Sequence, residues 1–127
     1  MKQLSKHINR NLRQRLRRKM RTRAKMNGTD ARPRMVVYRS NRHVYVQVID
    51  DLKGHTLVAT STLMPEIREG LEGGLKARAK KIGLEIARLC KEKGIGQVVF
   101  DRNGFIYRKG GRIDAVAAGA REGGLDF

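Results

Sequence analysis

Hydrophobic residues near the start of the chain recur at every fourth position, and almost all residues between them are basic or polar. The recurring residues are Leu4, Ile8, Leu12, Leu16 and Met20. Residues 1–27 contain no glycine or proline, so the spacing predicts one helix of about 23 residues. A spacing of four drifts by about 40° per step around a helix with 3.6 residues per turn. The apolar stripe of this helix therefore winds and is too narrow to bury well.

A different pattern begins at Met35, where residues of alternating character form three runs separated by polar turns. The runs span residues 35–39, 43–50 and 55–62, and the turns span residues 40–42 and 51–54. In the middle run, Val44, Val46 and Val48 face one way. His43, Tyr45 and Gln47 face the other way. The pattern predicts a three-stranded antiparallel meander with one aliphatic face and one polar and aromatic face.

The rest of the chain predicts helices and one further strand. Pro65, shortly after two hydroxyl residues, is typical of a helix start, although nearby glycines make that helix short or broken. The clearest helix spans residues 75–93, with Gly83 allowing close approach to a sheet and Gly94 ending it. Its predicted buried stripe is Leu75, Ala79, Ile82, Ile86 and Leu89. A short strand at 97–101, a basic loop at 101–111 and a helix at 112–122 follow. The fold class is therefore α/β (α+β), with helices packed on the aliphatic face of the sheet.

Charge divides the chain into two parts. The whole chain carries a net charge of +17. Residues 1–34 contain 13 basic residues and one acid, whereas residues 35–127 carry a net charge of only +5. We therefore predict a basic arm at 1–34, a globular body at 35–127 and a hinge at 28–33. No carboxylate lies within residues 1–29 to pair with the arginines, so the arm helix should be weak in water and form against RNA.

Composition excludes several classes of protein. The single cysteine, Cys90, permits no internal disulfide and no thiolate zinc cluster, and it lies beside the apolar stripe, where packing is its expected role. No apolar run approaches the roughly 20 residues that span a membrane. The N-terminal segment is Arg-rich and acid-poor, as mitochondrial transit peptides are, although it has few hydroxyl residues. The targeting alternative stays open.

Three groups of residues have the chemistry of RNA contacts: cations for phosphates, an aromatic ring for stacking and amides for base edges. The predicted rRNA-binding residues of the arm are Arg10, Arg13, Arg17, Arg18 and Arg21. Those of the strand-turn-strand segment are Arg39, Asn41, Arg42, His43, Tyr45 and Gln47, and those of the Gly-rich loop are Arg102, Tyr107 and Arg112. The loop lacks the Walker lysine and serine, which argues against nucleotide binding.

A metal-dependent nuclease is the alternative from another class. Asp50, Asp101 and Asp114 lie near strand ends or in a first helical turn, and paired carboxylates can hold magnesium ions. Each also has a structural explanation, because aspartate favours turns and the first turn of a helix. The three histidines are scattered without the spacing of metal ligands. We therefore expect no catalytic residue, no metal and no cofactor.

Taken together, these residues resemble the family of large-subunit ribosomal protein number 18, of the bacterial type that binds 5S rRNA. The resemblance covers nearly the whole chain and includes the basic N-terminal helix. Its motifs are Val-Tyr-Arg-Ser-Asn-Arg-His-Val-Tyr-Val-Gln-Val-Ile at 37–49, Leu-Val-Ala-Thr-Ser-Thr at 57–62, Ile-Gly at 82–83 with Ile-Ala at 86–87, Lys-Gly-Ile at 93–95, Phe-Asp-Arg-Asn-Gly-Phe at 100–105, Arg-Ile at 112–113, and Ala-Arg-Glu-Gly-Gly-Leu-Asp-Phe at 120–127. The family usually has Tyr-His-Gly-Arg where this chain has a loop two residues longer, without the histidine, from Tyr107 to Arg112.

The resemblance implies a cytoplasmic ribosomal protein without enzymatic activity. It implies 5S rRNA, 23S rRNA and neighbouring proteins of the central protuberance as partners, with no membrane and no small-molecule substrate. Another rRNA-binding protein of similar shape is the alternative of the same class.

Overall fold

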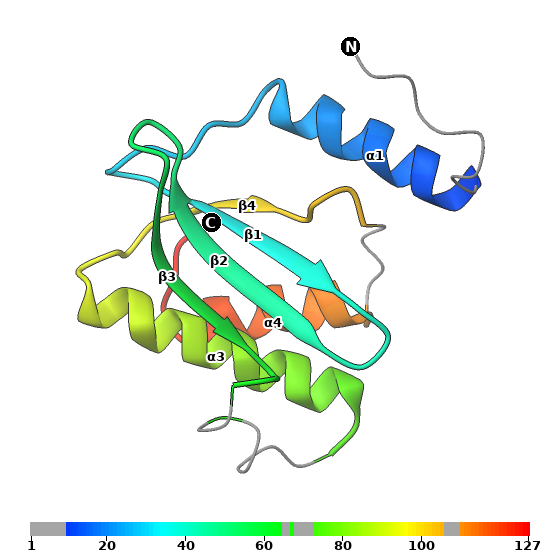
Figure 1. Ribbon diagram of the computed structural model, residues 1–127. Coiled ribbons are helices and arrows are strands. Elements are labelled where there is room, and N and C mark those ends of the chain that lie inside the picture. Colours follow the sequence, from blue (N-terminus) through cyan, green and yellow to red (C-terminus); the bar gives the residue numbers. More distant parts are fainter. Residues whose placement is uncertain (1–9, 65–66, 68–72, 106–109) are drawn as a thin grey trace.

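The computed structural model describes residues 10–64, 67, 73–105 and 110–127, and within them the sheet is the middle of three layers (Figure 1). The elements in chain order are α1 (Arg10–Arg23), β1 (Arg34–Arg39), β2 (Val44–Asp50), β3 (His55–Ser61), α3 (Leu75–Glu92), β4 (Val99–Asp101) and α4 (Arg112–Glu122). The strand order is β3-β2-β1-β4. The first three strands form the expected antiparallel meander, and β4 pairs with β1 in parallel. The predicted fold class is confirmed.

The aliphatic face of the sheet carries the hydrophobic core. Val46 and Val48 in β2 are fully buried, as are Ile82 and Ile86 in α3. Both α3 and α4 lie against this side of the sheet (Figure 1). Removal of these side chains from water is the main favourable term in folding, so the two-residue alternation of β2 sets which face becomes the interior.

The predicted buried stripe of α3 is confirmed at Ala79, Ile82 and Ile86, and it is wrong at Leu75. Leu75 is 43% exposed at the start of the helix, whereas Ala87 and Cys90 are buried. Burial raises the pKa of the Cys90 thiol to about 11, so the thiolate is disfavoured at neutral pH and the expected packing role of Cys90 is confirmed.

Gly83 allows a close approach, but its neighbour is α4 and not the sheet, so that expectation was wrong. A Cβ on Gly83 would clash with the backbone of Val116, and a Cβ on Gly119 would clash with the carbonyl oxygen of Lys80. The two glycines thus let α3 and α4 cross with their backbones in contact. Sequence spacing shows that a helix can approach something closely, but it does not identify the partner.

The fourth strand is shorter than the predicted run of 97–101. It begins at Val99, and Gln97 instead forms an isolated bridge with Asp126. The amide of Val98 donates to the carbonyl oxygen of Asp126, and Phe127 stacks on Phe100 with ring centroids 5.4 Å apart. Residues 97–98 therefore pair with the C-terminal segment and do not extend β4.

The described part of the N-terminal helix ends at Arg23, within the residues 1–27 for which a helix of about 23 residues was predicted. Residues 1–9 lie outside the described residues, as does most of the predicted helix start near Pro65. Gly28, within the predicted hinge, is buried and held from two sides. Its amide donates to Asp51 Oδ2 (2.6 Å), and its carbonyl oxygen accepts from the amide of Asp51 (3.0 Å). The backbone at Gly28, within the predicted hinge, is therefore fixed by two hydrogen bonds to Asp51.

Candidate nucleic-acid interface

The face of the sheet opposite the core is polar and aromatic, as the alternation predicted. Tyr38 in β1 pairs with Tyr45 in β2, and Val36 pairs with Gln47. The two tyrosine rings are tilted, with centroids 5.9 Å apart, and Tyr38 is 46% exposed. Large rings in these positions offer stacking surfaces to a ligand, because this part of the face is not filled by an apolar layer.

Helix α1 lies on this side of the sheet, joined to the loop that follows β4 (Figure 1). Arg18 Nε donates to the carbonyl oxygen of Gly104 (2.9 Å). Gly104 has a φ of +75°, and a Cβ there would clash with the carbonyl oxygen of Arg15. Glycine is therefore required at position 104 for two reasons: the backbone there is left-handed, and α1 passes too close for a side chain.

Arginine–aromatic contacts tether α1 next to this loop. The Arg15 guanidinium lies 3.9 Å from the Phe105 ring centroid and 5.4 Å from that of Tyr38. Arg39 lies 5.1 Å from the Phe105 centroid. Burial lowers the pKa of Arg15, but a guanidinium keeps its charge at any physiological pH. Arg15 is thus a structural cation, held over rings and not offered to a phosphate.

An ion-pair centre at Arg34 joins α1, the sheet and the β2–β3 turn. Arg34 Nη1 lies 2.8 Å from Asp101 Oδ2, and Arg34 Nε lies 3.0 Å from Asp51 Oδ2. Arg23 of α1 adds a second cation, 3.4 Å from Asp51. The hydrogen bond from Arg34 lowers the pKa of Asp51. Burial opposes the charge of Arg34, but its bonds to the two aspartates outweigh that effect and raise its pKa.

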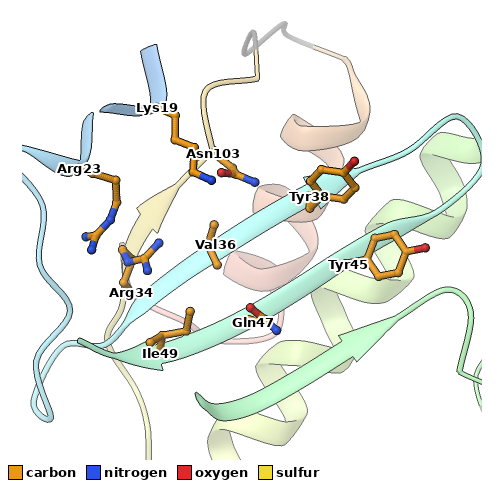
Figure 2. Close-up of a pocket in the computed structure, with 9 residues that line it drawn as sticks. All are labelled: Lys19, Arg23, Arg34, Val36, Tyr38, Tyr45, Gln47, Ile49 and Asn103. Carbon is orange, nitrogen blue, oxygen red and sulfur yellow. The ribbon is translucent and has the colours of Figure 1, made fainter. Parts of the chain in front are cut away.

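Between α1 and the sheet lies a groove of about 390 Å³ (Figure 2). Tyr38, Tyr45 and Gln47 line it from the sheet, and Lys19 and Arg23 line it from α1. Asn103, from the loop after β4, lines it as well. The groove combines rings, amides and cations, which is the chemistry expected of a surface that binds single-stranded RNA.

The predicted arm residues differ in their surroundings. Arg10, Arg17 and Arg21 are exposed, and they remain free to reach an outside ligand. Arg13 is half-buried, and the Nε of Arg18 is bound to Gly104.

The second and third predicted groups meet at the β1–β2 turn. Asn41 and Arg42 are exposed, while Gln47 is exposed on the sheet face. Arg112, at the start of α4, donates from Nη1 to the carbonyl oxygen of Ser40 (2.7 Å) and Asn41 (3.4 Å). Burial lowers the pKa of Arg112. Arg112 therefore braces the turn from inside the protein.

Three other members of these groups are half-buried or lie outside the described residues. His43 Nδ1 lies 2.9 Å from Thr62 Oγ1. Arg102 is half-buried next to β4, and Tyr107 lies outside the described residues.

Comparison with known proteins identifies the family of this chain. Residues 9–127 match the family described as "Ribosomal L18 of archaea, bacteria, mitoch. and chloroplast". The chain is 59% identical to the large ribosomal subunit protein uL18 of Desulfovibrio desulfuricans over 110 residues, which cover 86% of this chain and 90% of that protein. It is 55% identical to the uL18 protein of Thermotoga petrophila over 115 residues, covering 90% and 93% of the two chains. The chain belongs to the ribosomal L18 family. The matched segment includes α1 as well as the sheet.

Apart from Arg34 of the ion-pair centre, sequence reasoning missed four polar or aromatic residues that this L18-family chain brings to the groove: Lys19, Arg23, Tyr38 and Asn103. Tyr38 could have been found, since Met35 and Val37 set the buried phase of β1 and leave Tyr38 on the opposite face. The other three depend on how α1 and the loop meet. That contact between distant segments has no local signal in the sequence.

The aspartates that suggested a nuclease have structural partners. Asp50 Oδ1 accepts from the amides of Leu52 and Lys53, as expected for a turn. Asp101 is paired with Arg34, and Asp114 accepts from the amide of Gly110 (2.8 Å). Among the described residues, no three His, Cys, Asp or Glu side chains gather as metal ligands would. The L18 family consists of structural ribosomal proteins and not of enzymes.

Within the described part of the chain, no helix is both long and apolar enough to cross a membrane.

Proposed function

We propose that this L18-family protein is a structural constituent of the large ribosomal subunit that binds 5S rRNA and attaches it to 23S rRNA in the central protuberance, next to neighbouring ribosomal proteins of the cytoplasmic ribosome. The observation that carries the proposal is the composition of one side of the molecule. Exposed arginines of α1, the β1–β2 turn and the tyrosine-bearing sheet face all lie away from the core formed with α3 and α4. A protein of net charge +17 binds polyanions strongly.

The parts of this surface have separate roles in the proposed binding. Arg10, Arg17 and Arg21 neutralise phosphates and supply affinity that falls with salt. Tyr45 and Gln47 offer a stacking ring and an amide, which can distinguish RNA bases. The turn at Asn41 and Arg42, braced by Arg112, presents a cation and an amide on a fixed backbone.

The test measures the affinity of the full chain for a 5S rRNA transcript and for an unrelated RNA of equal length, over a range of salt concentrations. In one variant, Arg10, Arg17 and Arg21 are changed to Gln. Each lost phosphate contact flattens the plot of log K against log salt by roughly 0.7–0.9, so we expect a change of about 2–3 units. In the matched control, Lys80, Lys91 and Lys93 on or next to α3 are changed to Gln. These exposed lysines lie on the other side of the sheet, so the slope should stay as in wild type.

Equal affinity of wild type for the two RNAs would overturn the 5S assignment. Equal slopes for the two triple variants would remove α1 from the binding surface and bring the targeting alternative forward for this segment. The same mixtures, kept in magnesium and run on a denaturing gel, should contain intact RNA. Cleavage that is lost in Asp101→Asn would revive the nuclease alternative.

A further inference from the structure

One polar atom next to the groove has no partner within the part of the chain that the structure describes. Oδ1 of Asn103 is buried and accepts no hydrogen bond, and the residue as a whole is 6% exposed. Buried acceptors are nearly always satisfied in folded proteins, since an unsatisfied one destabilises the fold. The backbone of Asn103 has a left-handed φ of +58°, and its backbone N–H donates to Asp101 Oδ1 (2.8 Å). The backbone of this residue is therefore fixed beside the groove, while its side-chain oxygen accepts no hydrogen bond among the described residues.

The groove beside Asn103 has the size and the walls of a site for a flat ring. Its volume of about 390 Å³ lies within the range of about 300–1,000 Å³ typical of small-ligand pockets. Tyr38 packs against Phe105 and Arg15, whereas the described ring contact of Tyr45 is with Tyr38 alone. Tyr45 is thus the ring better able to receive a second aromatic system. Gln47, on the same strand, adds an exposed amide.

Three cations line the groove: Lys19 and Arg23 come from α1, and Arg34 of β1 is already paired with Asp51 and Asp101. Figure 2 draws Lys19 beside Asn103, and the backbone of Lys19 is close to neighbouring Gly104. Because Oδ1 of Asn103 is buried, a ligand can reach it only if neighbouring side chains move. The long Lys19 side chain beside it can rotate, which would leave its ammonium group at the rim of the groove. Arg23 lies at the other end and is already partly neutralised by Asp51. This leaves little free charge for the several phosphates of a free nucleotide, and it suits the single phosphate of a nucleotide within a chain.

We propose that this groove takes one unstacked nucleobase of the bound RNA, which stacks on Tyr45 and donates a hydrogen bond from its edge to Oδ1 of Asn103. The inference deepens the proposed function and rests on it. In this assignment Tyr45 supplies affinity, since any base can stack on it. Asn103 is the specificity-determining residue, because it requires an N–H group at one position of the base edge.

The test starts from base-specific chemical probing of a 5S rRNA transcript, free and bound to the full-length protein. We expect one unpaired base to become protected by wild type and by Tyr45→Phe, and to stay reactive with Tyr45→Ala or Asn103→Gly. Glycine accepts the left-handed backbone at 103, so this variant removes the acceptor and keeps the fold. Tyr45→Ala should weaken binding about tenfold, within the range for loss of base–aromatic stacking. Asn103→Gly should weaken it by up to about tenfold, as expected for the loss of one hydrogen bond. Gln97→Ala, which removes an exposed amide outside the groove, should bind as wild type does.

A second arm separates a direct contact from a structural role of Asn103. The protected nucleotide is replaced by an abasic one, and each RNA is measured with each protein. A direct contact predicts that the abasic RNA binds wild type about tenfold more weakly, and that Asn103→Gly then adds almost nothing. If the loss of affinity from the abasic nucleotide and the loss from Asn103→Gly multiply when combined, the two act independently and the proposal is overturned. The absence of any protected base would overturn it as well. Adenosine or guanosine monophosphate that displaces no RNA at millimolar concentration would support a base held within the chain, and tight binding of either would overturn it.

The two ideas can fail separately. If wild type shows no preference for 5S rRNA, the proposed function fails. If wild type prefers 5S rRNA and Tyr45→Ala, Asn103→Gly and the abasic RNA all bind normally, only the nucleobase site fails.

Discussion

The two faces of the sheet are built from alternate residues of the same strands, yet they are covered in different ways. On one face, α3 and α4 pack fully buried aliphatic side chains against β1 and β2. On the other, α1 is held by a guanidinium over Phe105, one hydrogen bond to Gly104 and an ion pair to Asp51. Apolar packing is strong and non-directional, whereas these polar contacts are few and directional. The face covered by α3 and α4 therefore supplies most of the stability of the fold, and the face under α1 keeps side chains that can bind a ligand.

The largest effect should come from the charged centre that links the two faces. Arg34→Met removes the cation beside Asp101, which is fully buried. The loss of one partner from a buried pair costs about 3–5 kcal/mol, because the remaining charge is left without compensation. Urea unfolding should show this loss. Arg42→Met, in the exposed turn, should change the free energy of unfolding by less than about 0.5 kcal/mol. A loss that small at Arg34 as well would contradict the buried pairing of Arg34 with Asp101.

The aliphatic face should respond next most strongly. Ile82→Ala opens a cavity where the side chain is fully buried, with an expected loss of about 2–5 kcal/mol in the free energy of unfolding. Leu84→Ala, two residues along the same helix and 37% exposed, should cost far less. Similar losses in the two variants would contradict the orientation of α3.

The attachment of α1 can be broken with a smaller loss of global stability. Gly104→Ala and Gly94→Ala both place a side chain at a φ near +75°, which costs roughly 1–2 kcal/mol in each case. Only Gly104 abuts α1, since a Cβ at Gly94 meets open space. Hydrogen–deuterium exchange should therefore accelerate in residues 15–23 of Gly104→Ala alone. Equal exchange in both variants, or an α1 that exchanges freely in wild type, would favour the sequence-based expectation of an arm that orders only on RNA.

Acid should loosen the same attachment by a small amount. The pKa of Asp51 is lowered in the folded state by its bond from Arg34. Its stabilising effect is therefore present above the unfolded pKa, about 3.9, and is lost as the pH falls through the lower folded value. The difference in unfolding free energy between wild type and Asp51→Asn should shrink by about 1 kcal/mol below pH 4. Asp30→Asn, at an exposed site, serves as the control and should show no such narrowing.

Local patterns predicted the parts of the fold that local chemistry decides. The alternation of Val44, Val46 and Val48 assigned the two faces of β2, and the segment 112–122 was predicted with its observed bounds. Placement of α1 could not be predicted, because Arg18 meets Gly104 across 86 positions in the chain. The ion pairs of Arg34 could not be predicted for the same reason. Arg34 resembles the other arm arginines in sequence, but it is the first residue of β1 and pairs with aspartates 17 and 67 positions away.

The crossing of α3 and α4 at Gly83 and Gly119 has a genetic consequence. These glycines lie on the far side of the sheet from the proposed RNA surface, yet any side chain there must push the two helices apart. Helix α4 begins with Arg112, whose guanidinium holds the backbone of the β1–β2 turn. Alleles at the two glycines would then show ribosome-assembly defects while every RNA-facing residue remained intact. The atoms that such a side chain would meet belong to the backbone of the partner helix. No smaller residue there would relieve the clash, so the expected suppressor is reversion to glycine and not a change among the arginines that face RNA.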